Sequence, residues 1–209
     1  MNYIEEKYKN VCNTPSDINE HLPVLFKYAK DCDTIIECGV RYCISSWALI
    51  YGLLCGNGGT NKKLILNDIN LDKCNLDELI SYTTDLPIEI KYACVNDLDL
   101  QIEHNYDMVF IDTWHVYGQL KRELNKFAPI TNKYIIMHDT TVDEIYGETI
   151  RMNLNANLQS IQTGIPLNEI NCGLGKAIYE FLELNHNDWE LIEKLTNNNG
   201  LTVLKRKNI

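Results

Sequence analysis

The sequence lacks a positive net charge, a long apolar segment and any basic patch outside its tail. Its formal net charge at pH 7 is −10, its pI is about 4.9, and the basic cluster at residues 205–207 lies at the C-terminus. Because so acidic a surface repels phosphate backbones, we expect no nucleic-acid partner. We find no signal peptide and no apolar span that would cross a membrane, so we expect a cytoplasmic protein without membrane association.

Closely spaced cysteine pairs are also missing. The 8 cysteines are scattered without a CxxC pair, and several lie in apolar runs, where a free thiol behaves as a small hydrophobe. Without a signal peptide, this pattern predicts free thiols in a reducing compartment rather than a disulfide framework. The same spacing argues against a zinc site built from cysteine ligands.

The 209 residues are enough for one sizeable α/β domain, and the most regular pattern lies near the middle. Residues 108–111 and 134–137 are apolar runs too short for ordinary helices, which is typical of strands buried on both faces of a parallel sheet. Between them, three apolar residues recur at helical spacing before Pro129: Leu120, Leu124 and Phe127. This pattern predicts a strand, a helix and a second strand parallel to the first.

Similar patterns predict further elements on both sides of this unit. We expect the other strands at residues 34–40, 63–69, 88–95, 189–195 and 201–205. We expect helices at residues 16–30, 47–54, 75–82 and 176–184. The pair Asn199-Gly200 predicts a hairpin between the last two strands. The predicted fold class is α/β, with a Rossmann-like, doubly wound, mostly parallel seven-stranded sheet and an antiparallel C-terminal hairpin.

Several helix ends carry recognisable signals. Three helices are preceded by capping residues, namely Ser16 or Asp17, Ser45 or Ser46, and Asn75 paired with Glu78 in a capping box. Gly56 ends the second of these helices. His21 lies in the first, where we expect a partly exposed surface histidine.

Polar residues follow successive strands of this predicted sheet. Glu37, Asp68 and Asp97 lie at or just past three strand ends, and Asn96 precedes the last of them. Two further strands end in Asp112, with His115 just beyond it, and in the pair His138–Asp139. In open α/β sheets the ligand crevice lies outside the carboxyl ends of the strands, so we expect all of these groups around one crevice.

The turn at residues 37–43 admits three interpretations. A dehydrogenase fingerprint, G-x-G-x-x-G, fails because Arg41 and Ile44 stand where glycines are required. A structural turn without a ligand is the second interpretation. The third is an E-x-G-x-x-x-G loop for S-adenosylmethionine, in which Cys43 replaces the last glycine. That cofactor carries an ammonium, a sulfonium and a ribose, which suit carboxylates better than a glycine-lined phosphate cradle.

From about residue 16 to the C-terminus, the chain resembles class I S-adenosylmethionine-dependent methyltransferases. Its motifs are most similar to those of a group with E-x-G-V-R near the first strand, D-x-x-H-x-Y after the fourth and H-D after the fifth. Here these motifs are Glu37–Arg41, Asp112–His115–Tyr117 and His138–Asp139. The chain departs from the pattern at Cys43 in the cofactor loop and at His138, where many relatives carry an acid.

The resemblance implies a set of site residues. The implied cofactor-binding residues are Glu37, Gly39, Arg41, Ser46, Asp68, Asn96, Asp97 and Asp112. The implied ligands of a divalent metal, Mg or Mn, are Asp112, His138 and Asp139. The implied catalytic residues are His115, as the base, and Asp112.

The sequence pattern predicts a domain organisation, and the resemblance implies a reaction. We expect a single domain over residues 1–209, with a helical lead-in at 1–33 and an insertion at 141–172 that covers the acceptor substrate. The expected reaction moves a methyl group onto a hydroxyl of a small molecule or glycan, with a sugar favoured. Relatives commonly self-associate, so a homo-oligomer is left open, although we find no exposed stripe to assign to an interface.

Other interpretations stay open from the sequence. Asp112 could cap the following helix, His115 could support another residue, and His138 could be a core histidine. A phenol or catechol could be the acceptor, since Trp114, Tyr117 and Tyr146 lie in the segments concerned. A hydroxylase-like activity and a non-catalytic module that binds the same cofactor are further alternatives.

Overall fold

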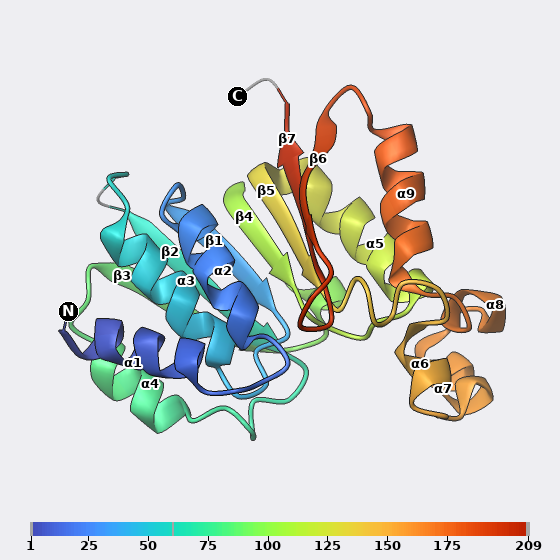
Figure 1. Cartoon of the computed structure of the whole chain (residues 1–209), viewed down its shortest axis with the longest axis horizontal. Helices are drawn as coiled ribbons and strands as arrows, with labels where there is room; N and C mark the ends of the chain where they lie inside the picture. The colour runs from blue at the N-terminus through green and yellow to red at the C-terminus, as the bar shows by residue number, and fades with distance from the viewer. Residues whose placement is uncertain (1, 60, 208–209) are drawn as a thin grey trace.

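The computed structural model describes residues 2–59 and 61–207, which contain one seven-stranded sheet in the order β3-β2-β1-β4-β5-β7-β6 (Figure 1). The strands are β1 (Thr34–Cys38), β2 (Lys62–Asp68), β3 (Ile88–Cys94), β4 (Tyr106–Ile111), β5 (Thr131–His138), β6 (Trp189–Leu195) and β7 (Leu201–Arg206). The first five are parallel, and β7 pairs antiparallel with both β5 and β6. The predicted fold class is confirmed, and the strand order reverses between β1 and β4.

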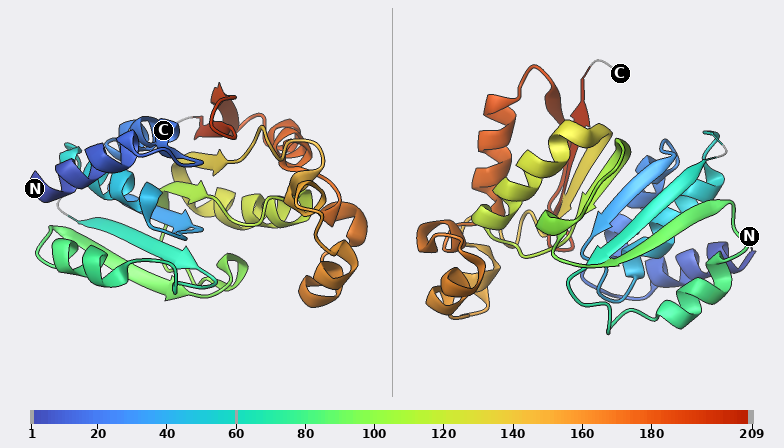
Figure 2. Two further views of the ribbon diagram at one scale, coloured as in Figure 1. Left: turned by 60° about the horizontal axis from the view of Figure 1, so that its bottom comes forward. Right: turned by 180° about the vertical axis from the view of Figure 1, so that it is seen from behind.

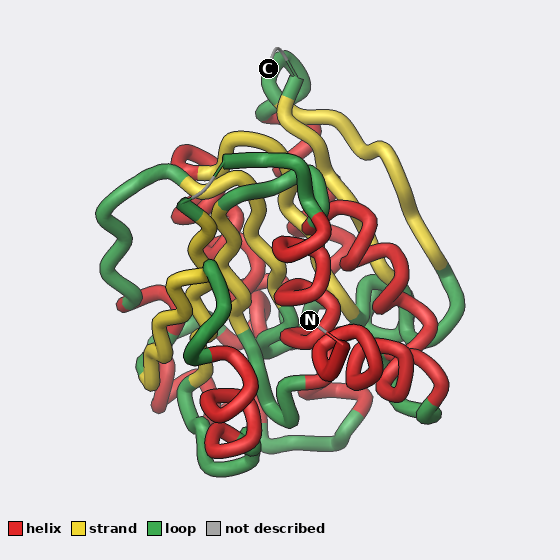
Figure 3. The backbone as a smooth tube through the Cα atoms, turned by 90° about the vertical axis from the view of Figure 1, so that its left-hand side faces the viewer, coloured by secondary structure: helices red, strands yellow, loops and turns green. Residues whose placement is uncertain are grey.

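Helices cover both faces of the sheet. One apolar core lies under α1 (Asn2–Asn13), α2 (Leu22–Ala29) and α3 (Ile44–Cys55), and α4 (Leu76–Thr83) contributes Leu79 to it. A second core lies between the opposite face and the helices α5 (Tyr117–Phe127) and α9 (Leu174–Leu184). Figure 1 shows α1–α3 in front of the sheet, and the rear view in Figure 2 brings α5 and α9 forward. Figure 3 views the molecule from the side on which the N-terminus lies.

The central unit has the predicted strand–helix–strand form. Met108, Val109 and Phe110 are fully buried in β4, as expected for a strand covered on both faces. The three apolar residues of α5 face the second core: Leu120, Leu124 and Phe127. Pro129 lies in a short 3₁₀ turn (Ala128–Ile130) that leads into β5. Parallel pairing of β4 with β5 brings their carboxyl ends together.

The helix predicted at residues 16–30 differs in the structure. Residues 2–13 form α1, whereas the predicted helix at 16–30 is divided into a 3₁₀ turn (Asn19–His21) and α2, with Pro23 in the first turn of α2. The expectation of a partly exposed His21 is wrong, because its side chain is fully buried and its ring centroid lies 5.3 Å from that of His138. The 3₁₀ turn packs against the C-terminal hairpin, where Glu20 donates its N–H to Asn198 Oδ1 over 3.1 Å.

The predicted cap of α3 is also wrong. This helix begins after Cys43, which has a left-handed φ of 61°, and the side chains of Ser45 and Ser46 donate hydrogen bonds to Glu37. A buried carboxylate needs donors, and this requirement takes the two hydroxyls away from the helix terminus. Two other signals are confirmed, since Gly56 follows α3 and Asn75 caps α4 in a reciprocal pair with Glu78. The predicted cap at Ser16 or Asp17 is wrong, because the residues that precede the 3₁₀ turn and α2 are Ile18 and His21, and neither provides a side-chain cap.

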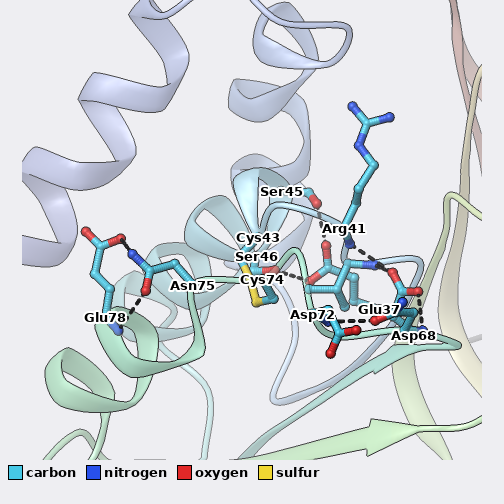
Figure 4. Close-up of a disulfide and its surroundings, with 12 residues drawn as sticks. Glu37, Arg41, Cys43, Ser45, Ser46, Asp68, Asp72, Cys74, Asn75 and Glu78 are labelled. Atoms are coloured by element: carbon cyan, nitrogen blue, oxygen red, sulfur yellow. Dashed lines mark hydrogen bonds between the residues drawn. A yellow bond between two sulfur atoms is a disulfide. The ribbon is translucent and has the colours of Figure 1, made fainter.

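A disulfide joins Cys43 to Cys74, contrary to the prediction of free thiols throughout (Figure 4). The two residues are 31 positions apart, but the turn after β1 and the loop after β2 lie at adjacent strand ends, with the two Cα atoms 5.7 Å apart. The remaining cysteines are free: Cys12, Cys32, Cys38, Cys55, Cys94 and Cys172. The bond therefore fastens one particular loop and is not part of a framework.

Residues 141–172 contain three short helices beyond the carboxyl ends of the strands: α6 (Gly147–Arg151), α7 (Ala156–Thr163) and α8 (Leu167–Ile170) (Figure 1). Large apolar side chains are exposed on this segment, namely Ile145, Tyr146, Met152, Leu154, Leu158 and Ile161. The sequence alone did not reveal this surface. Among the described residues, no helix has both the length and the apolar character needed to cross a membrane.

Candidate functional site

A cavity of about 780 Å³ opens at the carboxyl ends of the parallel strands. Its volume lies within the range of roughly 300–1,000 Å³ that is typical of small-molecule sites. Eight of the predicted site residues line it: Gly39, Arg41, Asp68, Asn96, Asp97, Asp112, His115 and Asp139. The cavity spans the point between β1 and β4 where the strand order reverses, as expected for an open α/β sheet.

Gly39 allows the ends of β1 and β4 to approach closely. Its φ is +89°, and a Cβ atom there would clash with the backbone carbonyl of Asp112. Backbone hydrogen bonds of 2.8 Å hold this arrangement, from Gly39 to the Asn67 carbonyl and from Asp112 to the Cys38 carbonyl. Glycine is therefore required here for both its backbone conformation and its lack of a side chain.

Asp68 fastens the turn after β1. Its Oδ2 accepts the backbone N–H groups of Val40 and Arg41, each over 2.9 Å, and its Oδ1 accepts that of Asn70 over 3.0 Å. These bonds fix Arg41 at a positive φ of 42°, while its guanidinium donates to Asp17 over 2.7 Å. The carboxylate predicted to bind ribose thus also shapes the loop that faces it.

Glu37 lies behind the loop and, with Ser46, is not among the described residues that line the cavity. Its side chain is fully buried and accepts hydrogen bonds from Ser45 and, over 2.7 Å, from Ser46 (Figure 4). Burial raises the pKa of Glu37 to about 8, although the two hydroxyls act in the opposite direction. The geometry places Glu37 and Ser46 as supports of the loop rather than as wall residues.

Asp97 belongs to a buried carboxyl pair beside the cavity. Gln119 donates to Asp97 Oδ1 over 3.0 Å and to Glu123 Oε1 over 2.9 Å, and Thr113 also donates to Glu123. Burial raises the pKa of both carboxyl groups, and Asp97 raises that of Glu123 further. Within the described structure, the buried Asp97 Oδ2 has no hydrogen-bond partner, so it can accept from a bound ligand. Asn96 caps the following 3₁₀ turn (Asp97–Asp99) by accepting from Leu98.

The residues after β4 and β5 converge around one imidazole. His115 Nε2 lies 3.1 Å from Asp112 Oδ1, and its Nδ1 lies 2.9 Å from Asp139 Oδ2. His138 Nδ1 lies 3.2 Å from Asp139 Oδ1 and 3.5 Å from Asp112 Oδ1, while its Nε2 contacts the Asn198 carbonyl at 3.2 Å. His138 is buried and is not among the described wall residues of the cavity.

These contacts shift the pKa values of the cluster. Burial lowers the pKa of His115, but the carboxylates of Asp112, Asp139 and Asp143 outweigh it and raise that pKa well above its usual value. Burial alone would raise the pKa of Asp112, yet hydrogen bonds from His115 and His138 bring it below its usual range. The three carboxylates thus favour the protonated form of His115, and a cation bound to them would oppose that effect.

The donor set fits a divalent cation. Two groups of three ligand atoms, each within 4.8 Å of one another, share Asp139; one is Asp112, His138 and Asp139, and the other is His115, Asp139 and Asp143. The buried Asp139 Oδ1 and His115 Nδ1 have no hydrogen-bond partner among the described residues. Carboxylate oxygens with an imidazole suit Mg²⁺ or Mn²⁺. The first group is the one implied by the sequence resemblance.

Asp143 and Arg151 were not predicted from the sequence. Both come from the segment after β5, and Arg151 donates to Asp143 through Nε and Nη2, each over 2.7 Å. The available sequence signal was weak, since Asp143 follows Asp139 by one helical turn in a region without a clean period. Gln119 and Glu123 were also missed, although both lie on the buried side of α5.

The far wall of the cavity comes from residues 141–172 and from the loop after β4. Its side chains are largely amides and hydroxyls with some apolar surface: Trp114, Glu148, Gln159, Gln162, Thr163 and Ile165. Trp114 donates to Thr149 over 3.2 Å, and Thr149 donates to Gln159 over 2.9 Å, so the two segments are linked. Of the aromatic residues considered for a phenol acceptor, Tyr117 is buried and Tyr146 is exposed away from this wall.

No protein-family model and no curated protein matches the chain. Among solved structures, it is similar to a putative caffeoyl-CoA O-methyltransferase from Staphylococcus aureus, with a TM-score of 0.63 and 14% identity over 97% of this chain and 91% of that one. A methyltransferase from Podospora anserina, solved with S-adenosylhomocysteine (SAH), gives a TM-score of 0.59 and 13% identity over 98% and 88%. For the N-methyltransferase NodS from Bradyrhizobium japonicum, the TM-score is 0.57 and the identity is 10%, over 92% of this chain and 96% of that one.

The chain has the fold of the class I S-adenosylmethionine-dependent methyltransferases. Identities this low establish the fold, and the neighbours act on different kinds of acceptor atom, as their names state. The reaction of this particular chain therefore has to be argued from its own site.

Proposed function

We propose that the protein transfers the methyl group of S-adenosylmethionine to a hydroxyl group, with a sugar of a small molecule or glycan as the favoured acceptor and a divalent cation as an aid. The observation that carries this proposal is the convergence of Asp112, His115 and Asp139 at one side of a cavity whose other side is lined by Gly39 and Asp68. One cavity thus combines a cofactor-type loop with an acid–imidazole cluster.

The assignment of S-adenosylmethionine to one side of the cavity rests on the hydrogen-bonding capacity of the residues there. Asp68 lies where a Rossmann-type fold binds ribose hydroxyls, and a carboxylate can accept two hydrogen bonds. Asp97 offers an unpaired buried oxygen to a donor of the ligand. Glu37 acts through the loop, because it is buried beneath it.

The roles proposed for the residues near the acceptor rest on the chemistry of a sugar hydroxyl. Such a hydroxyl stays protonated at neutral pH and is a poor nucleophile. Asp112, His138 and Asp139 are the residues that would hold the cation. That cation would offset the charge of the carboxylates and stabilise the developing alkoxide. His115 is then placed to take the hydroxyl proton as the methyl carbon leaves the sulfonium for the oxygen, which releases SAH.

A phenol or catechol is the second candidate acceptor, and Trp114 on the cavity wall favours it. Gln159, Gln162 and Thr163 on the same wall favour a polyol instead, because amide and hydroxyl groups can both donate to and accept from sugar hydroxyls. We place the sugar first on this ground.

The test is turnover with methyl-labelled S-adenosylmethionine against a panel of sugars, glycosides and catechols, with a chelator and with Mg²⁺ or Mn²⁺ restored. We expect a methylated sugar and an equal amount of SAH, both lost on chelation. Turnover that resists the chelator would remove the metal from the proposal, and methylation of catechols alone would change the acceptor class. An oxidised product without SAH would favour the hydroxylase-like alternative, and SAH binding without turnover would favour the non-catalytic one.

A further inference from the structure

Helix α7 leaves an apolar face without a partner, and no residue of this helix is buried. Leu158 and Ile161 are three residues apart and so lie on one side of it, 49% and 82% exposed, and the exposed Leu154 lies just before its start. A helix of 8 residues has little stability of its own and usually gains it by packing an apolar stripe against another element. We call Leu154, Leu158 and Ile161 the α7 face; the part of the chain that the structure describes does not cover it.

The α7 face points away from the substrate cavity. Gln159 and Thr163, which lie on other sides of the helix, line the cavity, whereas none of the three residues of the α7 face is among its described wall residues. Helices α6–α8 form a lobe at the end of the molecule opposite α1 (Figures 1 and 2). A second macromolecule can therefore approach the α7 face without meeting the body of the protein.

The stretch around this face also carries no charge. Residues 152–168 contain no Asp, Glu, Lys, Arg or His, although 23% of all residues in the chain are charged. Their polar side chains are amides and hydroxyls, which can both donate and accept hydrogen bonds. The core of a protein–protein interface is likewise depleted of charged residues. The stretch thus has the composition of an interface and not that of the rest of this acidic surface.

The acidity of the chain favours a second copy as the occupant of the face. Two copies, each with a net charge of −10, repel one another wherever their acidic surfaces meet. In a two-fold contact the same patch lies on both sides, so a charged patch would oppose itself. An uncharged apolar patch avoids both costs, and the α7 face is such a patch.

Other occupants fit the face less well. Amphipathic helices that lie on membrane surfaces carry Lys or Arg on their polar side. Helix α7 has no basic residue, and the nearest one before it, Arg151, is bonded to Asp143. A basic partner protein would be attracted to the acidic surfaces of the chain and not to an uncharged stretch.

We propose that the α7 face joins two copies of this chain in a symmetric dimer, with Leu158 and Ile161 of each copy packed against the α7 face of the other. Each helix then gains the apolar packing that it lacks within its own chain. The dimer covers the helix whose other sides line the cavity. This inference does not depend on the reaction proposed above.

The experiment measures the mass of the protein in solution by light scattering, from micromolar to millimolar concentration, and the dissociation constant by sedimentation. It compares the wild type with Leu158→Lys and Ile161→Lys. The control is Leu184→Lys, which replaces an apolar residue at the end of α9 that is 81% exposed. Circular dichroism and urea unfolding confirm that each variant is folded, as expected for exposed positions.

We expect the wild type to have twice the chain mass of 24.1 kDa. Each of the two α7 variants should raise the dissociation constant by at least about tenfold, because a charge would be buried in the contact. An added Lys reduces the negative net charge and hence the general repulsion between copies, so dissociation would have to come from the face itself. Leu184→Lys should stay dimeric like the wild type.

A wild type that is monomeric over the whole concentration range would overturn the proposal, and so would a dimer that both α7 variants leave intact. Sedimentation with phosphatidylcholine vesicles tests the other occupant. A monomeric wild type that sediments with the vesicles, and loses this binding in Ile161→Lys, would assign the face to a membrane surface instead. Titration of the same samples with SAH tests the proposed function separately, whichever mass is found.

Discussion

The disulfide between Cys43 and Cys74 allows a prediction with a definite magnitude. The two cysteines are 31 residues apart, and both are nearly buried, with 2% and 8% of their surface exposed. In the chain-entropy model, closing a loop of this length in the unfolded state stabilises the fold by about 3–4 kcal/mol. Reduction should therefore lower the free energy of unfolding by that amount.

The assay is urea unfolding of the wild type with and without a dithiol reductant. The double variant Cys43→Ala, Cys74→Ala should unfold like the reduced wild type and should not respond to the reductant. Cys94→Ala, at an exposed free cysteine, serves as the control and should keep the full response. SAH affinity should change little on reduction, because Asp68 still fastens the loop in the folded state through two hydrogen bonds.

Equal unfolding curves with and without reductant would refute this reasoning. They would mean that the two thiols are not joined in the protein or that the loop is already restricted in the unfolded chain. A large loss of SAH affinity without a loss of stability would equally contradict it, because the bond would then act on the folded loop.

Three further predictions concern single residues. Because burial raises the pKa of Glu37 to about 8 in the folded protein, the free energy of unfolding should be highest below about pH 4.5 and should fall as the pH rises towards 8. Glu37→Gln removes this titration, so its free energy of unfolding should rise relative to wild type by up to about 4 kcal/mol between pH 5 and 8. Identical pH profiles of the two proteins in urea unfolding would contradict this. Gly39→Ala should abolish SAH binding in calorimetry and lower the free energy of unfolding by at least about 1 kcal/mol. The control is Gly164→Ala, where φ is also positive at +72° but no atom lies within 4 Å of the added Cβ. It should lower the free energy of unfolding only through backbone strain and should still bind SAH. Asp139→Asn should raise the Mg²⁺ or Mn²⁺ concentration needed for half-maximal turnover and leave SAH affinity unchanged; an unchanged metal requirement would exclude Asp139 as a ligand.

Much of the fold could be predicted because its signals are local. Apolar runs such as those of β4 and β5 identify buried strands, and strand ends then place Asp112 and Asp139 at one edge. These steps use only short-range pattern and the geometry of parallel sheets, and both residues do line the cavity.

The errors arise where a residue's surroundings come from distant segments. His21 is buried because the C-terminal hairpin packs over it, and Cys43 meets Cys74 because two loops adjoin at neighbouring strands. Ser45 was expected to cap a helix but instead serves the buried Glu37. In each case the two partners are more than one helical turn apart in the sequence, so no periodic pattern predicts that they meet.

The acceptor side of the site was the least predictable. Residues 141–172 were expected to cover the acceptor, and this role stays a prediction. Their short helices contact the loop after β4 through Trp114 and the His115 carbonyl, and Asp143 pairs with Arg151 inside the segment. Short helices with many exposed apolar residues have no clear period, and their conformation is set by what they pack against.

The central claim, that this cavity binds S-adenosylmethionine, is tested most directly by calorimetric titration of the protein with SAH. We predict saturable binding with one site per chain, whether or not Mg²⁺ or Mn²⁺ is present, because the proposed cation serves the acceptor and not the cofactor. The absence of binding by a folded wild-type protein would contradict the claim and leave an α/β domain whose ligand must be sought among other molecules.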